Sequence, residues 1–364
     1  MKAGIVGLPN VGKSTLFNCL SNAKAQSANF PFCTIEPNIG VVNVPDPRIN
    51  KLEELVKPER VQMATVDIVD IAGLVKGASK GEGLGNQFLG NIRECNAIIH
   101  VLRCFDNDNI VHVDGNVNPI RDKETIDIEL QLKDLETIEK RLEKVKRAAK
   151  TGNKEAQTEE ALLNRIREAL LQAKSARTII PQSNDEEVLM EGFQLITAKP
   201  VLYVCNVDEG SAVNGNKYVD QVRELVKDEE AEVIILSVGA EADITELESY
   251  EERQVFLEDM GLTEPGASVL IRAAYKLLKQ QTYFTAGVKE VRAWTIEKGW
   301  KAPQAASVIH TDFEKGFIKA EVIAYDDYVK YQTEAACKEA GRLRIEGKEY
   351  VVADGDVMHF RFNV

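Results

Sequence analysis

The sequence predicts an α/β protein with a largely parallel sheet, an inserted helical hairpin and a small α+β domain at the C-terminal end. Short apolar runs alternate with helical patterns from the start of the chain, which is typical of parallel sheets. No strand pattern occurs over residues 121–176, and after Thr282 short strand-like segments and frequent turns replace the alternation. The expected strands of the parallel sheet are residues 3–6, 39–44, 61–71, 97–102, 201–205 and 233–236.

Composition limits the class of protein. The 364 residues are 44% hydrophobic, which is enough for two or three domains with real cores. There is no apolar run of about 18 residues and no signal-peptide pattern, so we expect a cytoplasmic protein without a membrane span. The net charge of -13 repels nucleic acid, so any RNA contact needs local basic patches. The six cysteines form no CxxC pair, which predicts free thiols and no zinc site.

Residues 7–14 (GLPNVGKS) match the G-x-x-x-x-G-K-[ST] pattern between a strand and a helix expected from about residue 13 to 20. The glycines allow backbone amides to form a nest for phosphate oxygens, and the helix N-terminus favours negative charge. Lys13 is expected to reach the β- and γ-phosphates, and the Ser14 hydroxyl to bind Mg²⁺. The predicted phosphate-binding residues are Asn10, Val11, Gly12, Lys13, Ser14 and Thr15.

The remaining parts of a nucleoside triphosphate site follow along the chain. Asp70 ends an expected strand, where a carboxylate suits Mg²⁺ directly or through water, and the Gly73 amide can meet the γ-phosphate. Thr34 lies in a loop that can add a hydroxyl to Mg²⁺ in the triphosphate state. The glycine-rich segment 77–85 predicts a loop that changes conformation with the γ-phosphate. The predicted metal ligands are Ser14, Thr34 and Asp70, and the predicted catalytic residues begin with Lys13, Thr34, Asp70 and Gly73.

The base-recognition turn departs from the GTPase pattern N-K-x-D. The strand 201–205 is followed by Asn206, but Val207 stands at the lysine position and Glu209 at the aspartate position. The longer Glu209 side chain displaces the carboxylate that would pair with guanine, so we expect a weakened guanine preference with residual GTP binding. The predicted base-side residues are Asn206, Val207, Glu209, Ser237, Val238 and Gly239.

These motifs resemble those of the Obg-related P-loop NTPases. The resemblance rests on residues 10–15 (NVGKST), 32–37 (FCTIEP) and 70–77 (DIAGLVKG). The NVDE turn at 206–209 and the C-terminal segment narrow it to the YchF/Obg-like ATPase subfamily, over essentially the whole chain. The segments that look like the TGS domain of this subfamily, a ubiquitin-like β-grasp, are 283–287, 301–303 and 310–317.

The resemblance implies a P-loop (OBG-type) NTPase domain, an inserted antiparallel coiled coil and a C-terminal TGS domain. It also implies the use of ATP, with backbone groups near Val207 contacting the base, and association with the ribosome, its large subunit and its rRNA. The domain boundaries expected are 1–120 with 198–280 for the NTPase, 121–197 for the hairpin and 281–364 for the TGS domain. A monomer that binds ATP, ADP and Mg²⁺ is the expected form.

The sequence departs from Ras-like switches at the position that orients the attacking water. Leu74 stands where Ras-like switches place a water-orienting glutamine, and leucine cannot hydrogen-bond water. His112, in the loop 106–118, is a candidate for orienting water and is added to the catalytic set, with a surface histidine as the favoured alternative. Asn10 stands where some relatives help to bind K⁺, which makes K⁺ a candidate second cofactor.

Helical spacing over residues 121–176 predicts the two arms of the hairpin, joined by a turn at 151–153. Two sets of residues form the predicted apolar faces: Ile128, Leu132, Leu135, Ile138, Leu142, Val145 and Ala149, then Leu162, Leu163, Ile166, Leu170 and Ala173. The cations near the tip indicate either a solvated helix face or an arm that contacts phosphates. They are Lys140, Arg141, Lys144, Lys146, Arg147, Lys150 and Lys154. A second candidate surface comprises Lys315, Lys319, Arg342, Arg344, Lys348 and Arg361.

The sequence therefore predicts a slow ATPase that couples its nucleotide state to ribosome or RNA binding. Two alternatives stay open: a GTPase switch of the same architecture, and a ribosome-binding adaptor in which the nucleotide is structural.

Overall fold

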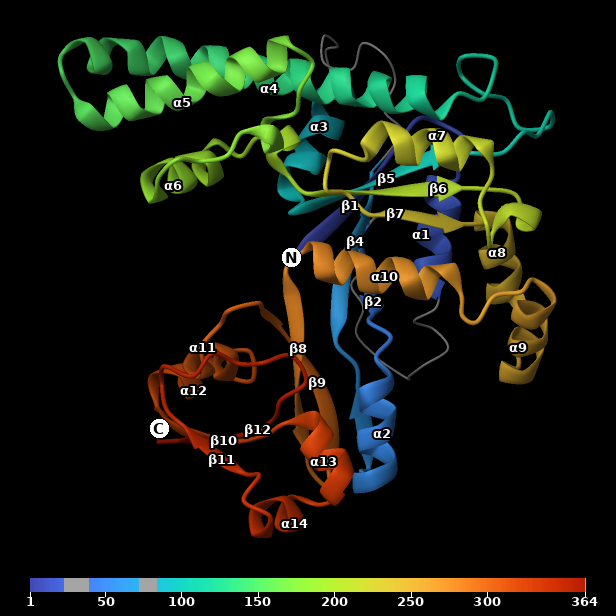
Figure 1. Cartoon of the computed structure of the whole chain (residues 1–364), viewed down its shortest axis with the longest axis vertical. Helices are drawn as coiled ribbons and strands as arrows, with labels where there is room; N and C mark the ends of the chain where they lie inside the picture. The colour runs from blue at the N-terminus through green and yellow to red at the C-terminus, as the bar shows by residue number, and fades with distance from the viewer. Residues whose placement is uncertain (23–38, 72–83, 364) are drawn as a thin grey trace. The chain divides into compact units, whose positions relative to one another are not determined.

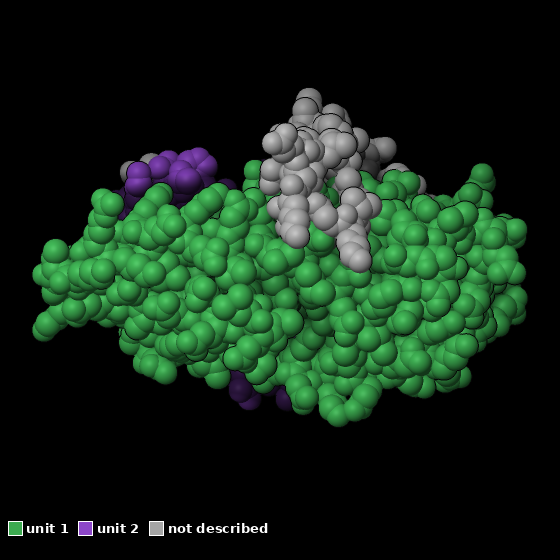
Figure 2. All heavy atoms as spheres, turned by 90° about the horizontal axis from the view of Figure 1, so that it is seen from above, with its two compact units in different colours: residues 1–41, 67–274 green, residues 42–66, 275–364 purple. Residues whose placement is uncertain are grey.

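The structure is a computed structural model that describes residues 1–22, 39–71 and 84–363 (Figure 1). The chain forms two compact units, which are coloured separately in Figure 2. The first unit comprises Met1–Val41 and Asp67–Ala274, and the second comprises Val42–Val66 and Tyr275–Val364. Residues 42–66, which the sequence placed in the NTPase domain, therefore belong to the unit that holds the C-terminal segment.

The first unit contains the predicted parallel sheet, whose strand order is β2-β4-β1-β5-β6-β7. All residues of β5 and β6 are buried, as expected for central parallel strands covered on both faces. The strands are β1 (Lys2–Val6), β2 (Ile39–Asn43), β4 (Thr65–Asp70), β5 (Ala97–Arg103), β6 (Val201–Asn206) and β7 (Val233–Leu236). The helices outside the hairpin are α1 (Lys13–Asn22), α3 (Leu84–Glu94), α7 (Lys217–Val226), α8 (Val238–Glu246), α9 (Tyr250–Asp259) and α10 (Gly266–Leu277).

The predicted helical hairpin is confirmed (Figure 1). It consists of α4 (Pro119–Lys150) and α5 (Lys154–Leu171), each capped by an asparagine side chain at its N-terminus. Gly152 has a φ of 87° in the turn between them, a conformation that suits glycine. The hairpin core is formed by Ile138, Leu142, Leu162, Leu163, Ile166 and Leu170, against Phe193 of α6 (Asn184–Phe193).

Part of the predicted apolar face is wrong. Ile128 and Leu132 are 48% and 39% exposed, and Ala173 lies beyond the end of α5, where its φ is 57°. Gln131 donates a hydrogen bond to the Ala173 carbonyl, which shows that α5 ends opposite this point of α4. The beginning of α4 therefore has no α5 side chains to cover Ile128.

A buried carboxylate fixes the base of the hairpin. Asp134 of α4 is fully buried and accepts hydrogen bonds from the Ile196 amide (2.9 Å), the Thr197 amide (2.7 Å) and the Thr197 hydroxyl (2.7 Å). Burial raises the pKa of this carboxyl, and the three hydrogen bonds oppose that shift. The segment η2 (Ile196–Ala198), which leads into β6, is thereby joined to the hairpin.

The second unit is built on a mixed sheet of order β11-β10-β12-β8-β9-β3, as expected for a β-grasp. Its strands are β3 (Arg60–Gln62), β8 (Gln280–Ala286), β9 (Glu290–Glu297), β10 (Phe317–Ile323), β11 (Arg344–Glu346) and β12 (Val357–Phe362). Its helices are α2 (Pro47–Val56), α11 (Ala302–Ser307), α12 (Thr311–Lys315), α13 (Tyr325–Tyr331) and α14 (Glu334–Glu339). Tyr283, Phe317, Met358 and Phe360 lie in its core.

The prediction of one strand over residues 61–71 is wrong. The run is divided between β3, which pairs with β9, and β4, which pairs with β1. An apolar run indicates that its residues form buried strands. It does not show that all of these residues belong to the same sheet.

Among the described residues, no helix combines the length and the apolar character needed to cross a bilayer. The described cysteines are free thiols, as predicted: Cys19, Cys95, Cys104, Cys205 and Cys337.

Replacing Asp134 tests the anchoring of the hairpin. Asp134→Ala leaves two buried amides without acceptors, so we expect the free energy of unfolding to fall by about 2–4 kcal/mol. Denaturant unfolding followed by circular dichroism measures this loss. Glu143→Ala, at an exposed carboxylate of the same helix, is the matched control and should change it by less than about 0.5 kcal/mol. A loss below about 1 kcal/mol for Asp134→Ala would show that the base is held by other contacts.

Candidate nucleotide site

The predicted phosphate loop lies between β1 and α1, and both of its glycines have another atom too close to leave room for a Cβ. A Cβ on Gly7 would lie 2.6 Å from the Val101 carbonyl oxygen. Gly12 has a φ of 100°, and a Cβ there would lie 2.6 Å from Asn206 Nδ2. The helix α1 begins at Lys13, directly after the loop, so its N-terminal amides face the phosphate position.

Asn206 connects the phosphate loop to the opposite side of the site. Its Nδ2 donates to the Val11 carbonyl (3.0 Å), and its Oδ1 accepts from the Val238 amide (3.0 Å). The side chain is buried at the end of β6, so both bonds are shielded from water. The structure thus brings together Val11, Gly12, Asn206 and Val238, four of the residues predicted from separate motifs.

Lys13 is held inside the loop. It is buried, and its Nζ donates to the Leu8 carbonyl at 2.6 Å. Burial lowers the Lys13 pKa to about 8, against the opposing attraction of Asp70. The ammonium therefore lies in a poorly solvated place, where phosphate oxygens would stabilise its charge.

The residues present fit a Mg²⁺ ion. Asp70 Oδ1 is buried and has no hydrogen-bond partner in the described part of the chain. A buried carboxylate oxygen without a partner is costly, and a cation would satisfy it. Asp70 ends β4 beside Ile5 of β1, the strand that leads into the phosphate loop, and Ser14 is exposed in the first turn of α1.

The base side of the site differs from the guanine-specific arrangement. Val207 is buried, and its amide donates to the Leu236 carbonyl. The neighbouring Asp208 accepts from Ser211 and caps the short helix η3 (Glu209–Ser211), while Glu209 is exposed. Ser237 caps α8 through the Ala240 amide, and Gly239 is exposed at the start of that helix. No contact between Glu209 and the phosphate loop occurs within the described residues.

His112 is buried, so the expectation of a surface histidine is wrong. Its Nδ1 accepts from the Asp114 amide (3.1 Å), which leaves Nε2–H to donate to Asp122 Oδ2 (2.8 Å). The oxygens of Asp114 and Asp122 lie near the same ring, but the Arg121 guanidinium already contacts both carboxylates. We therefore assign no metal to this cluster.

Several predicted residues lie outside the described residues: Thr34, Gly73, Leu74 and most of the glycine-rich segment 77–85. Asn10 and Thr15 are described and exposed. Asn10 has a φ of 62° and donates from Nδ2 to the Val111 carbonyl (3.2 Å).

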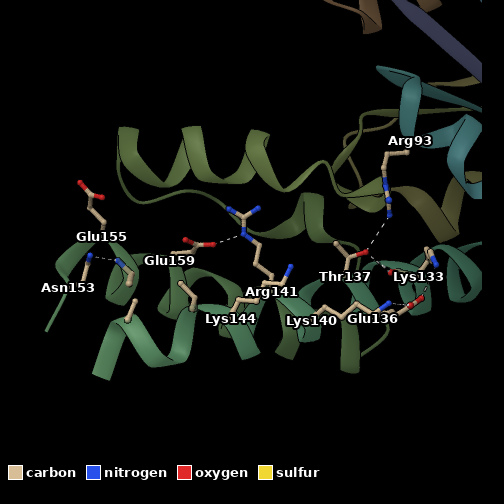
Figure 3. A pocket seen from close by; sticks show the side chains of 13 residues that line it. Arg93, Lys133, Glu136, Thr137, Lys140, Arg141, Lys144, Asn153, Glu155 and Glu159 are labelled. Atoms are coloured by element: carbon tan, nitrogen blue, oxygen red, sulfur yellow. Dashed lines mark hydrogen bonds and ion pairs between the residues drawn. The ribbon is translucent and has the colours of Figure 1, made fainter. Parts of the chain in front are cut away.

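The hairpin carries a groove of about 750 Å³ along one side of α4 and α5 (Figure 3). Glu136 forms ion pairs with Lys133 and Lys140, and Glu159 pairs with Arg141. Arg93 of α3 points into this region, where its Nη2 reaches the Thr137 hydroxyl at 3.4 Å and its buried Nε has no partner among the described residues (Figure 3).

Five cations near the tip of the hairpin, called here the tip cations, are exposed and form no ion pair within the described chain. They are Lys144, Lys146, Arg147, Lys150 and Lys154. The C-terminal cations differ, because most are neutralised locally. Arg361 and Lys319 pair with Glu321, and Arg344 pairs with Glu346.

The phosphate loop on a parallel sheet and the family models define a P-loop NTPase. Residues 2–135 match the family described as 50S ribosome-binding GTPase, and residues 280–363 match the YchF-GTPase C-terminal family, described as a protein of unknown function. The chain belongs to the YchF family. It is 56% identical to the "Ribosome-binding ATPase YchF" of Pasteurella multocida, covering 100% of this chain and 99% of that protein.

Two further comparisons agree on the family. The protein of the same name from Bacillus subtilis is 54% identical over the whole of both chains. The structure described as the Schizosaccharomyces pombe YchF GTPase matches with a TM-score of 0.90 at 40% identity, covering 99% of this chain and 97% of that one. These names disagree on the nucleotide: the bacterial proteins are called ATPases and the fission-yeast protein a GTPase.

Sequence patterns did not reveal the contact of Asp122 with His112 or the bridging role of Asn206. Asp122 stands in the first turn of α4, where an acidic residue is common for helix stability alone. Only the folded chain shows that it meets a histidine ten residues away.

The lowered Lys13 pKa predicts that nucleotide binding takes up protons. Bound phosphates raise the pKa again, so the complex should bind about half a proton more than the free protein at pH 8, and almost none more at pH 6.5. Affinity for Mg·ATP should accordingly fall as pH rises above 8. Calorimetry at pH 8 in two buffers with different ionisation enthalpies measures the uptake. Equal heats in both buffers would show that Lys13 is already fully charged.

Proposed function

We propose that this chain is a ribosome-binding ATPase, which binds and slowly hydrolyses ATP and uses GTP less well. The observation that carries the proposal is the combination of three features in one unit. They are the phosphate loop, the buried Asp70 oxygen without a hydrogen-bond partner in the described chain, and the altered base turn at 206–209. The bacterial relatives named for this activity match along the full chain, which supports the proposal.

The base turn supports ATP over GTP. A guanine-specific site needs a carboxylate held beside the base, and here the equivalent residue, Glu209, is exposed. The Asn206 amide is used within the protein, on the phosphate loop and Val238. Backbone groups near Val207 and the start of α8 are then the contacts available to an adenine ring.

Hydrolysis at this site depends on positioning and on neutralising charge. Lys13 would hold the β- and γ-phosphates, and Gly73 is the residue that the sequence predicts to supply an amide to the γ-phosphate. Ser14, Thr34 and Asp70 would hold Mg²⁺, which neutralises charge on the phosphates. For His112 to orient water, one of its two hydrogen bonds, to Asp122 or from the Asp114 amide, must break, because both ring nitrogens are engaged.

Asn10 supports K⁺ as a second cofactor. A carbonyl can only accept, so the bond to Val111 identifies the nitrogen end of the Asn10 amide. The oxygen end, Oδ1, is left as a ligand for a monovalent cation.

The ribosomal contact that we propose is the hairpin tip, acting on rRNA phosphates of the large subunit. The exposed tip cations have no acidic partners in the described chain, whereas Lys319, Arg342, Arg344 and Arg361 of the second candidate surface each form an ion pair. This difference favours the phosphate-contacting arm over a solvated helix face, although the chain as a whole is acidic. The protein acts as a monomer in the cytoplasm.

Competition between nucleotides tests the enzyme proposal. In calorimetry we expect Mg·ATP to bind at least about tenfold more tightly than Mg·GTP. The reason is that guanine lacks its usual carboxylate contact at this site, and such a loss costs about 1.4 kcal/mol or more. Lys13→Ala should abolish binding of both. GTP binding ten times tighter than ATP would identify a GTPase switch. Full ribosome binding and cellular effect in Lys13→Ala would identify an adaptor.

Salt dependence tests the hairpin contact. Replacing Lys146, Lys150 and Lys154 together by alanine should reduce the slope of log affinity for ribosomes against log salt by about 2 to 3. The slope falls because fewer counterions are released on binding when fewer phosphates are contacted. The matched control replaces three exposed lysines outside the hairpin: Lys217, Lys227 and Lys276. An unchanged slope for the hairpin variant, or equal losses in both, would exclude the tip as the contact.

A further inference from the structure

The segment 104–118, between β5 and α4, touches the phosphate loop. Val111 is 74% exposed, yet its carbonyl accepts from Asn10 Nδ2 at 3.2 Å. This bond sets the orientation of the Asn10 amide. The segment is therefore placed to influence the nucleotide site, although it contains no residue of the phosphate loop.

A buried arginine shapes this segment from the side of the sheet. Arg103, the last residue of β5, is 2% exposed and donates to the carbonyls of Phe105 (3.2 Å), Asn107 (3.0 Å) and Ile110 (2.9 Å). Arg103 forms no ion pair with any described carboxylate. The three hydrogen bonds to carbonyls therefore offset the cost of burying its guanidinium group. Val111 directly follows the last of these carbonyls, so its position is set by the arginine.

The other side of the segment is held by the hairpin. His112 donates from Nε2 to Asp122 Oδ2 at 2.8 Å, and we call this buried pair the clasp. Arg121 contacts the second oxygen, Asp122 Oδ1, at 3.0 Å. Asp122 therefore has both oxygens occupied and is fixed in the first turn of α4.

The helix α4 is continuous from Asp122 to the tip cations, because it runs unbroken from Pro119 to Lys150. Asp134, which lies between Asp122 and the tip cations on this helix, joins it to the Ile196 and Thr197 amides. The contacts then run from α4 through the clasp to Val111 and from Val111 to Asn10. Each step is a hydrogen bond between named groups or the peptide chain itself.

We propose that Asp122 is a positioning residue that couples partner binding at the hairpin to nucleotide binding at the phosphate loop. The inference rests on the proposed function. The two states differ in the clasp, which is closed in this structure and broken in the other state. Coupling between two sites is reciprocal, so nucleotide changes ribosome affinity by the factor by which ribosomes change nucleotide affinity.

The test measures the affinity of the full chain for purified ribosomes with and without a nonhydrolysable Mg·ATP analogue. The ratio of the two affinities should be about fivefold or more for the natural protein. Asp122→Ala should bring it below about twofold, while the affinity for the analogue alone changes by less than about threefold. Asp122→Asn should retain the coupling, because its amide oxygen can accept the same bond from His112.

Asp114→Ala is the matched control, since the Asp114 contact with His112 uses only the backbone amide, and its ratio should equal that of the natural protein. If Asp122→Ala does not fold, His112→Ala removes the same bond and is measured by binding alone. A natural ratio in either variant, a ratio of one in the natural protein, or loss of coupling in Asp122→Asn would overturn the inference. Absence of any ribosome binding by the natural protein would instead overturn the proposed function.

Discussion

The bond pair made by Asn206 is the constraint on which the nucleotide site depends. One buried amide joins the phosphate loop, through Val11, to the first residue of α8, Val238. Gly12 suits glycine because its φ is 100° and a Cβ there would lie only 2.6 Å from this amide nitrogen. The phosphate loop and the start of α8 are thus joined by one buried side chain, and a ligand need not order this contact.

Other buried polar groups hold the remaining parts of the first unit in the same manner. Asp134 joins the hairpin to the chain entering β6, and Glu241 of α8 accepts from the Gly266 amide at the start of α10 (2.6 Å). Burial raises the pKa of the Glu241 carboxyl, and bonds from the Gly266 and Ala267 amides oppose this. In each case a side chain fixes one end of a helix or strand, while apolar packing supplies the bulk of the stability.

The sequence predicted the position of the phosphate loop better than the contacts around it. The phosphate loop is contiguous, and its geometry requires particular residue types, so Gly12 and Lys13 could be assigned from spacing alone. The burial of His112 and its bond to Asp122 could not be predicted, because a hydrogen bond between a loop and a helix leaves no periodic pattern. Ile128 was misplaced because helical spacing shows which residues share a face but not where the covering helix ends. The roles of the site residues remain predictions, and Thr34 and Gly73 also lie outside the described residues.

The division of residues 61–71 between two sheets means that the second unit is not a terminal appendage. The backbone passes between the units three times, near residues 41, 66 and 274. The excursion through α2 and β3 leaves the first unit soon after Thr34 in the chain and returns through β4, which ends at Asp70. Thr34 and Asp70, two predicted magnesium ligands, therefore lie on either side of this excursion in the sequence. Its strand β3 pairs with β9 (Glu290–Glu297), which is more than 200 residues further along the chain. A truncation before residue 280 would remove β9, the strand with which β3 pairs. The N-terminal part of the chain therefore contains a strand that needs the C-terminal part to complete its sheet.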